Sequence, residues 1–166
     1  MVTILCTQKL LKLLGKEPLS SPSQPTNRLG GWYANVIETP INDAVIFTSE
    51  VTLVSVFVPL TSRALVLPLF VLRVQSLLQS FNLPMDVIKR EMSEYSELVV
   101  TRTASRNIVS SMNQISSELW VTVEMMREQR KVPVNLSEAE SLINSGVRGV
   151  SPYIHPDRRT RELLMN

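Results

Sequence analysis

The clearest periodic pattern in the chain lies in TASRNIVSSMNQISSELW, residues 103–120, and continues to residue 126. At 100° per residue, apolar side chains recur within about 60° of one direction on a helix. They are Ile108, Met112, Ile115, Leu119, Val123 and Met126. A stripe of this kind is typical of a helix buried along one side. We therefore predict a long helix that packs across a sheet.

Shorter patterns predict the remaining elements. Runs rich in β-branched and aromatic residues predict strands at 2–5, 32–38, 44–50, 51–58 and 96–103. Helical periodicity predicts helices at 9–14, 67–81, 84–95, 135–146 and 156–164. We expect Thr7 and Gly15 to cap the first helix, Pro68 to open the second, and Ser137 with Glu140 to form a capping box.

The order of these elements favours one α+β domain over residues 1–166. Three early strands in sequence predict an antiparallel meander, and the helices follow with one returning strand. We expect a mostly antiparallel sheet of about five strands with helices packed on one face. The segment at about 16–28 holds Pro18, Pro22 and Pro25 among serines, which predicts a mobile loop.

Composition and charge limit the classes of protein to which the chain can belong. The chain has 166 residues, of which 44% are hydrophobic, and a net charge of +2, so charge alone gives little case for nucleic acid. The apolar region at 51–72 is interrupted by Pro59, Arg63 and Pro68, and its runs are shorter than the ~20 residues of a membrane span. One cysteine fits a reducing compartment, so we expect a cytoplasmic protein without a membrane partner.

Several chemistries have few residues to support them. The single histidine, His155, and the single cysteine, Cys6, leave no metal cluster, and the five glycines form no phosphate-binding fingerprint. We therefore predict no metal and no cofactor. Cys6 is interpreted mainly as a core residue and His155 as a turn residue, while a hydrolase that uses either of them stays open as a third hypothesis.

The candidate ligand site lies on the polar edge of the long helix. Arg106, Ser110 and Asn113 gather on one side of it, together with Ser117. A guanidinium and an amide two turns apart can contact one carboxylate, phosphate or backbone segment. The structural alternative is that Arg106 and Asn113 tether the helix to the preceding strand or a loop.

Two further candidates lie in the strand region. Glu50 follows an apolar strand at a tight turn, where a carboxylate either accepts backbone N–H groups or faces a ligand, and the turn role is favoured. Asn35 lies in the predicted strand at 32–38 and is included as a candidate ligand-binding residue.

Five blocks, taken in order, resemble one bacterial family, catalogued as domain of unknown function 6933. The blocks are CTQKLL (6–11), LGGWYAN (29–35), FTSEVTL (47–53), TASRNIVSSMNQ (103–114) and SPYIHPDRRTRELL (151–164). The fourth resembles the family's T-N-x-R-S-V-L-G-S-M-N-D at Thr103, Arg106, Ser111, Met112 and Asn113, whereas Gln114 replaces the usual acid. The resemblance implies an α+β domain, no assigned activity, and an accessory or mobile-element origin.

Three hypotheses for function follow. The first is a non-enzymatic interaction or regulatory domain that binds another protein or itself. The second is a nucleic-acid or nucleotide-binding protein, including a nuclease-type effector, that uses Arg106, Asn113 and the C-terminal arginines Arg148, Arg158, Arg159 and Arg161. The third is the small hydrolase that uses Cys6 or His155.

Overall fold

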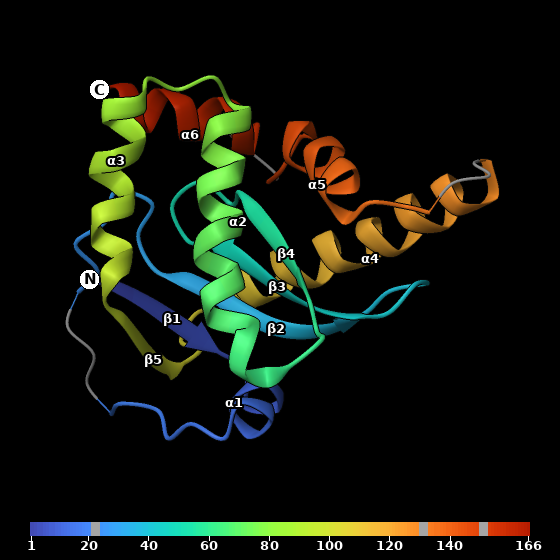
Figure 1. Ribbon diagram of the computed structural model, residues 1–166, viewed down its shortest axis with the longest axis horizontal. Helices are drawn as coiled ribbons and strands as arrows, with labels where there is room; N and C mark the ends of the chain where they lie inside the picture. Colours follow the sequence, from blue (N-terminus) through green and yellow to red (C-terminus); the bar gives the residue numbers. More distant parts are fainter. Residues whose placement is uncertain (21–23, 130–132, 150–152) are drawn as a thin grey trace.

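A computed structural model describes residues 1–20, 24–129, 133–149 and 153–166 (Figure 1). The strands are β1 (Val2–Cys6), β2 (Trp32–Glu38), β3 (Asp43–Ser49), β4 (Ser55–Pro59) and β5 (Leu98–Arg102). The helices are α1 (Gln8–Leu14), α2 (Val66–Ser80), α3 (Met85–Ser93), α4 (Arg106–Gln129), α5 (Leu136–Ser145) and α6 (Pro156–Met165). Two short 3₁₀ helices, η1 (Arg63–Leu65) and η2 (Glu94–Ser96), precede α2 and follow α3.

The five strands form one mixed sheet in the order β4-β3-β2-β1-β5. The strands β2, β3 and β4 form the expected antiparallel meander, while β1 runs parallel to both of its neighbours, β2 and β5. Most paired positions are antiparallel, so the predicted α+β class and the mostly antiparallel sheet are confirmed. The parallel pairs require crossovers, which α1 and the following loop provide between β1 and β2.

Helices cover both faces of the sheet, and the prediction of helices on one face was wrong. Along β2, Trp32 and Ala34 belong to the hydrophobic cluster under α2 and α3, whereas Tyr33 and Ile37 belong to the cluster under α4 and α5. Figure 1 shows α2 in front of the sheet and α4 behind it. The physical reason is visible in β3, where the continuous apolar run at 44–47 is buried on both faces, as expected of a strand between two helical layers.

The local signals for the first helix are confirmed. The Thr7 side chain accepts a hydrogen bond from the backbone N–H of Leu10 and caps α1. Gly15 ends the helix in the left-handed conformation at φ 62°, which costs glycine little because it has no Cβ. The side chain of Cys6, directly before this helix, is buried as predicted.

Three local predictions need correction. The helix α2 begins at Val66 after η1, so Pro68 lies inside its first turn and is not its first residue. The strand β4 begins only at Ser55, because residues 50–52 form a turn and Leu53, directly after it, has φ 58°. The cap of α5 is Asn135, whose side chain accepts from the Ser137 N–H, and no capping box forms because Glu140 is used elsewhere.

The loop at about 16–28 is attached at both of its described ends. The backbone N–H of Leu19 donates to the Val100 carbonyl at the outer side of β5, and the Thr101 hydroxyl donates to the Leu19 carbonyl. At the other end, the Arg28 N–H donates to Glu91 on α3. Residues 21–23 lie outside the described part of the chain, and the mobility of the loop stays a prediction.

Candidate functional site

The start of α4 is fixed to the sheet by its capping residue. Ser105 accepts hydrogen bonds from Ile108 and Val109, through its hydroxyl and its carbonyl respectively. The Ser105 N–H donates in turn to the Tyr33 hydroxyl on β2, at 3.1 Å. Capping and the tie to β2 therefore set the direction of α4 without help from Arg106.

The structure brings three of the predicted site residues together on the outer face of α4. Arg106, Ser110 and Asn113 are all exposed, and the side chain of none of them bonds to another described residue. Ser117 continues the row, with its hydroxyl donating to the Asn113 carbonyl. The side chains of Arg106, Ser110 and Asn113 face solvent and not their own backbone, so the tether expected in the structural alternative is absent among the described residues.

Asn35 and Glu50 do not join this row. The Asn35 Oδ1 accepts from the Thr7 hydroxyl at 2.6 Å, which links β2 to the start of α1. The Glu50 carboxylate accepts from the Gly31 N–H at 2.8 Å. A Cβ at Gly30 or Gly31 would meet Glu50 at 3.3 Å or less, so the glycines allow this close approach. Both candidates thus have local structural partners.

The polar row leads into an apolar hollow of about 480 Å³. It lies between α4, the start of α1 and the end of β2, and is lined by Lys9, Ile37, Glu38, Ser116, Ser117, Trp120 and Val121. The side chains of Trp120 and Val121 are 48% and 51% exposed, and both line this hollow. One turn further on, Met125 is also exposed. On the helical projection Trp120 lies at the boundary between the apolar stripe and the polar edge, and no pattern in the sequence predicts this patch.

The C-terminal arginines do not form a common site with Arg106. Arg148 is buried, pairs with Glu118 of α4 at 2.7 Å, and donates to the Ile143 carbonyl. Arg158, Arg159 and Arg161 lie on α6, which packs against α3 and α5. The basic residues Arg130 and Lys131 lie outside the described part of the chain.

The two residues of the hydrolase hypothesis have unfavourable surroundings. Burial raises the pKa of the Cys6 thiol to about 12, although Lys16 opposes the shift, so the thiol stays protonated at neutral pH. The His155 Nδ1 lies 3.0 Å from the Ser145 carbonyl, at the start of α6. Within the described ranges, no group of His, Cys, Asp and Glu side chains is arranged to hold a metal ion.

Sequence analysis also missed two buried carboxylates, Glu91 on α3 and Glu140 on α5. Glu91 accepts from the N–H groups of Arg28 and Leu29, and Glu140 accepts from the Phe57 N–H and from Arg73. Desolvation by burial raises the pKa of both carboxyls. Their acceptor atoms are used by the fold, so we assign both to structure.

Comparisons with known proteins give one result. The model of a protein family described as "Domain of unknown function (DUF6933)" matches residues 3–159. No curated protein and no solved structure matches the chain. Among the described residues, no helix combines the length and the apolar character that crossing a bilayer requires.

Proposed function

The chain belongs to the DUF6933 family, and we propose that it is a non-enzymatic cytoplasmic interaction domain that pairs with a second copy of itself along α4. The observation that carries the proposal is the exposed apolar patch of Trp120, Val121 and Met125 beside the hollow on the outer face of this helix. Exposed aromatic residues next to an apolar hollow are typical of the centre of a protein interface.

The outer face of α4 is complementary to itself in the antiparallel direction. Ser117 points directly outward, and Arg106 and Glu128 lie eleven residues before and after it, within about 20° of the same direction. A two-fold axis at Ser117 therefore places Arg106 opposite the partner's Glu128. Neither Arg106 nor Glu128 has an ion pair with another described residue, so both charges are free for this contact.

The same axis explains the apolar patch. Trp120 lies three residues after Ser117 and about 60° to one side of its direction, so the axis places the two Trp120 side chains on the same flank of the interface. A small residue at the crossing point lets the two helices approach closely. Burial of Trp120 supplies most of the binding free energy, whereas the exposed ion pairs contribute little and mainly fix the antiparallel direction.

Sedimentation over a range of protein concentrations tests the proposal. We expect the wild type to form a dimer, and Trp120→Ala to raise its dissociation constant about tenfold or more. Leu142→Ala on α5 is the matched control, because Leu142 is 56% exposed but lies outside the interface. A wild type that stays monomeric, or a dimer that Trp120→Ala leaves unchanged, would contradict the proposal.

Charge exchange tests the direction of pairing. Arg106→Glu and Glu128→Arg should each weaken the dimer, because each places like charges opposite one another. The double variant restores opposite charges and should regain the affinity of the wild type. Failure of this rescue, with Trp120→Ala still disruptive, would exclude the antiparallel register.

A further inference from the structure

Two polar side chains of α5 are bonded to one edge of the sheet. The helix lies beside β4, the last strand on that side (Figure 1). Asn144 accepts from the Ser55 N–H through Oδ1 and donates to the Ser55 carbonyl through Nδ2, both at 2.8 Å. Glu140 accepts from the Phe57 N–H at 2.9 Å. Asn144 thus makes with Ser55 the pair of hydrogen bonds that a residue of a neighbouring strand would make.

These contacts account for the outward N–H groups of β4. The Leu60 N–H donates to the Asp43 carbonyl, so the alternation of an antiparallel ladder directs even-numbered residues to β3 and odd-numbered residues outward. The outward N–H groups of Ser55 and Phe57 donate to α5, and Pro59 has no N–H. Within β4, all of which the structure describes, no outward N–H is left for a further strand.

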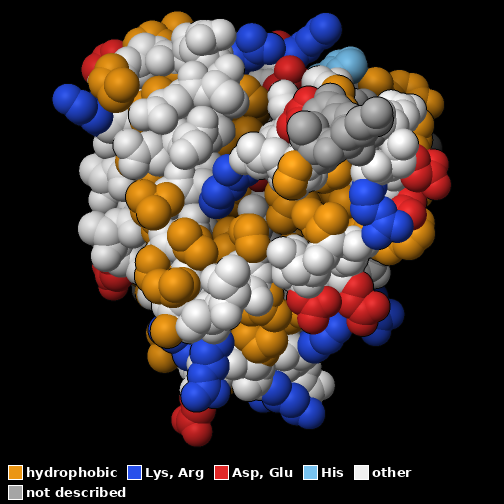
Figure 2. Space-filling view, turned by 45° about the vertical axis from the view of Figure 1, so that its right-hand side comes forward, with side chains coloured by type: hydrophobic (Ala, Val, Ile, Leu, Met, Phe, Trp, Pro, Cys, Tyr) orange, Lys and Arg blue, Asp and Glu red, His pale blue; other side chains and the backbone are white. Residues whose placement is uncertain are grey.

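The cover by α5 ends at Phe57. Beyond it, Phe57 and Pro59 line a hollow of about 430 Å³, together with Ile41 of the β2–β3 turn and Leu136 of α5. Figure 2 turns this side of the molecule forward and shows hydrophobic side chains at its surface between charged ones. Because proline lacks an N–H, Pro59 offers no donor where the edge is open.

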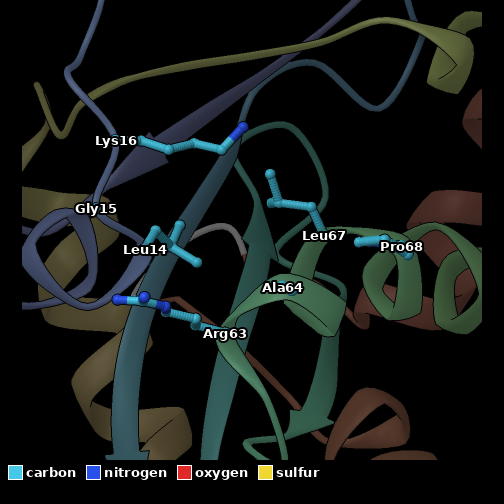
Figure 3. Close-up of a pocket in the computed structure, with 7 residues that line it drawn as sticks. All are labelled: Leu14, Gly15, Lys16, Arg63, Ala64, Leu67 and Pro68. Carbon is cyan, nitrogen blue, oxygen red and sulfur yellow. The ribbon is translucent and has the colours of Figure 1, made fainter.

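The chain leaves the sheet directly after β4. The Thr61 N–H donates to the Pro59 carbonyl at 3.0 Å, and η1 then leads into α2. There Ala64 of η1 and Leu67 of α2 line a hollow with Leu14 of α1 (Figure 3). Strand pairing with another molecule at this edge is therefore limited to β4 itself.

The sequence of β4 explains why its edge needs a cover. Residues 51–62, VTLVSVFVPLTS, contain no charged residue and are rich in β-branched side chains, which favour strand pairing. Charged side chains commonly protect edge strands from pairing with another copy, and this segment has none. A strand without charge does not repel its own copy. We propose that Asn144 and Glu140 form an edge cover, which keeps β4 from pairing in the antiparallel direction with β4 of a second copy.

Sedimentation of Asn144→Ala tests the edge cover. Trp120→Ala is present in every protein compared, so that pairing along α4 does not contribute. We expect the association constant to rise about tenfold or more, because Ser55 loses both hydrogen bonds to α5 and regains them in a β4–β4 pair. Asn144→Leu removes the same bonds but retains more of the side-chain bulk, and it should act in the same direction if Asn144→Ala folds poorly.

Ile143→Ala is the matched control. Ile143 is a buried residue of the same helix, and its apolar side chain packs in the cluster under α4. The variant lowers stability but leaves the hydrogen bonds of Asn144 and Glu140 to β4 in place, so it should not increase association. Association of both Asn144 variants that is no stronger than that of Ile143→Ala overturns the proposal.

Amide hydrogen exchange shows where the second copy binds. At low protein concentration, Asn144→Ala should make the Ser55 N–H exchange about tenfold faster. The Phe57 N–H, which keeps its bond to Glu140, should keep its rate. At high concentration the Ser55 N–H should become protected again as β4 pairs. Association that leaves Ser55 unprotected places the contact elsewhere and also overturns the proposal.

The edge cover and the α4 interface are separate. Ser55 lies on β4 and bonds to α5, whereas Trp120 lies on the outer face of α4. A wild type that does not pair along α4 leaves the result for Asn144→Ala unaffected, and failure of the edge cover leaves the result for Trp120→Ala unaffected.

Discussion

Two buried glutamates attach helices to the rest of the fold in different ways. On α5, Glu140 accepts from the Phe57 N–H of the edge strand β4 and from the guanidinium of Arg73, at 2.9 and 2.8 Å. On α3, Glu91 accepts from the N–H groups of Arg28 and Leu29 and from the Asn27 side chain, without a cationic side chain bonded to it. The first carboxylate is half of a charge pair, and the second is held by amide donors.

The difference matters because a buried charge is costly when it loses its partner. Burial raises the pKa of both carboxyls, and Arg73 and the Phe57 N–H oppose that shift at Glu140. At Glu91, the opposing groups are mainly backbone N–H groups and Asn27. Removal of Glu140 leaves a guanidinium unpaired, whereas removal of Glu91 leaves only neutral donors unpaired. The two sites should therefore respond unequally to the same substitution.

The largest effect is expected for Glu140→Ala. Loss of the carboxylate leaves Arg73 without its ion pair and the Phe57 N–H without an acceptor. Breaking a buried pair in this way costs about 3–5 kcal/mol in the free energy of unfolding. Urea unfolding followed by circular dichroism measures the loss.

A double variant shows whether the unpaired charge causes this loss. Glu140→Gln keeps an acceptor for the Phe57 N–H, and Arg73→Met removes the charge while retaining much of the side-chain volume. We expect the combination to recover more than half of the stability that Glu140→Ala loses. If it is as unstable as Glu140→Ala, the ion pair is not the main contribution.

A smaller effect is expected for Glu91→Ala. The N–H groups of Arg28 and Leu29 lose their acceptor, which costs about 1–3 kcal/mol for buried neutral donors. The same unfolding measurement gives the comparison directly. A loss at Glu91 that equals or exceeds the loss at Glu140 would remove the distinction between the two sites.

The long-range partners of these glutamates explain why sequence analysis missed them. In the sequence, Glu91 and Glu140 look like ordinary solvent-exposed helix residues, and Glu140 even has capping-box spacing with Ser137. Their burial depends on partners 62 to 83 residues away, and no local pattern encodes that pairing. The stripe from Met112 to Met126 was predictable because helical periodicity is local.

The candidate site shows the same limit of prediction from local sequence patterns. The outward row of Arg106, Ser110 and Asn113 follows from helix geometry alone and was predicted as one edge. Whether that edge tethers the helix or faces solvent depends on the neighbouring elements, and only the fold decides it. The hollow beside Trp120 needs α1 and β2 as further walls, so it has no signal within the helix.

The pH dependence of stability gives a further test of the buried Glu91, with a smaller expected effect. Because the pKa of Glu91 is raised above 4.5, the folded state holds the proton more tightly than the unfolded state. The free energy of unfolding therefore rises as the pH falls from the raised pKa towards 4.5. The full increase is reached below pH 4.5, the pKa of the unfolded state. Each unit of pKa difference corresponds to about 1.4 kcal/mol. Glu91→Gln should flatten this dependence, measured by urea unfolding between pH 4.5 and 7.

The matched control is Glu162→Gln, because Glu162 is exposed on α6. This variant should keep the pH dependence of the wild type. If Glu91→Gln leaves the slope of the free energy of unfolding against pH unchanged, the unfolded and folded states bind the same number of protons at this position. That result would contradict a raised pKa for Glu91 in the folded state.

The smallest effect is expected for Arg106→Ala. Arg106 is a charged residue like Glu140, but it is exposed and makes no ion pair with another described residue. Its removal uncovers no buried donor or charge, so the free energy of unfolding should change by less than about 0.5 kcal/mol. The measurement should be made at a protein concentration below the dissociation constant of the proposed dimer, because dimerisation adds apparent stability. If Arg106→Ala lowers the free energy of unfolding of the monomer about as much as Glu91→Ala does, then Arg106 tethers α4 to its own chain. Its role would then be to stabilise the fold and not to pair with a second copy.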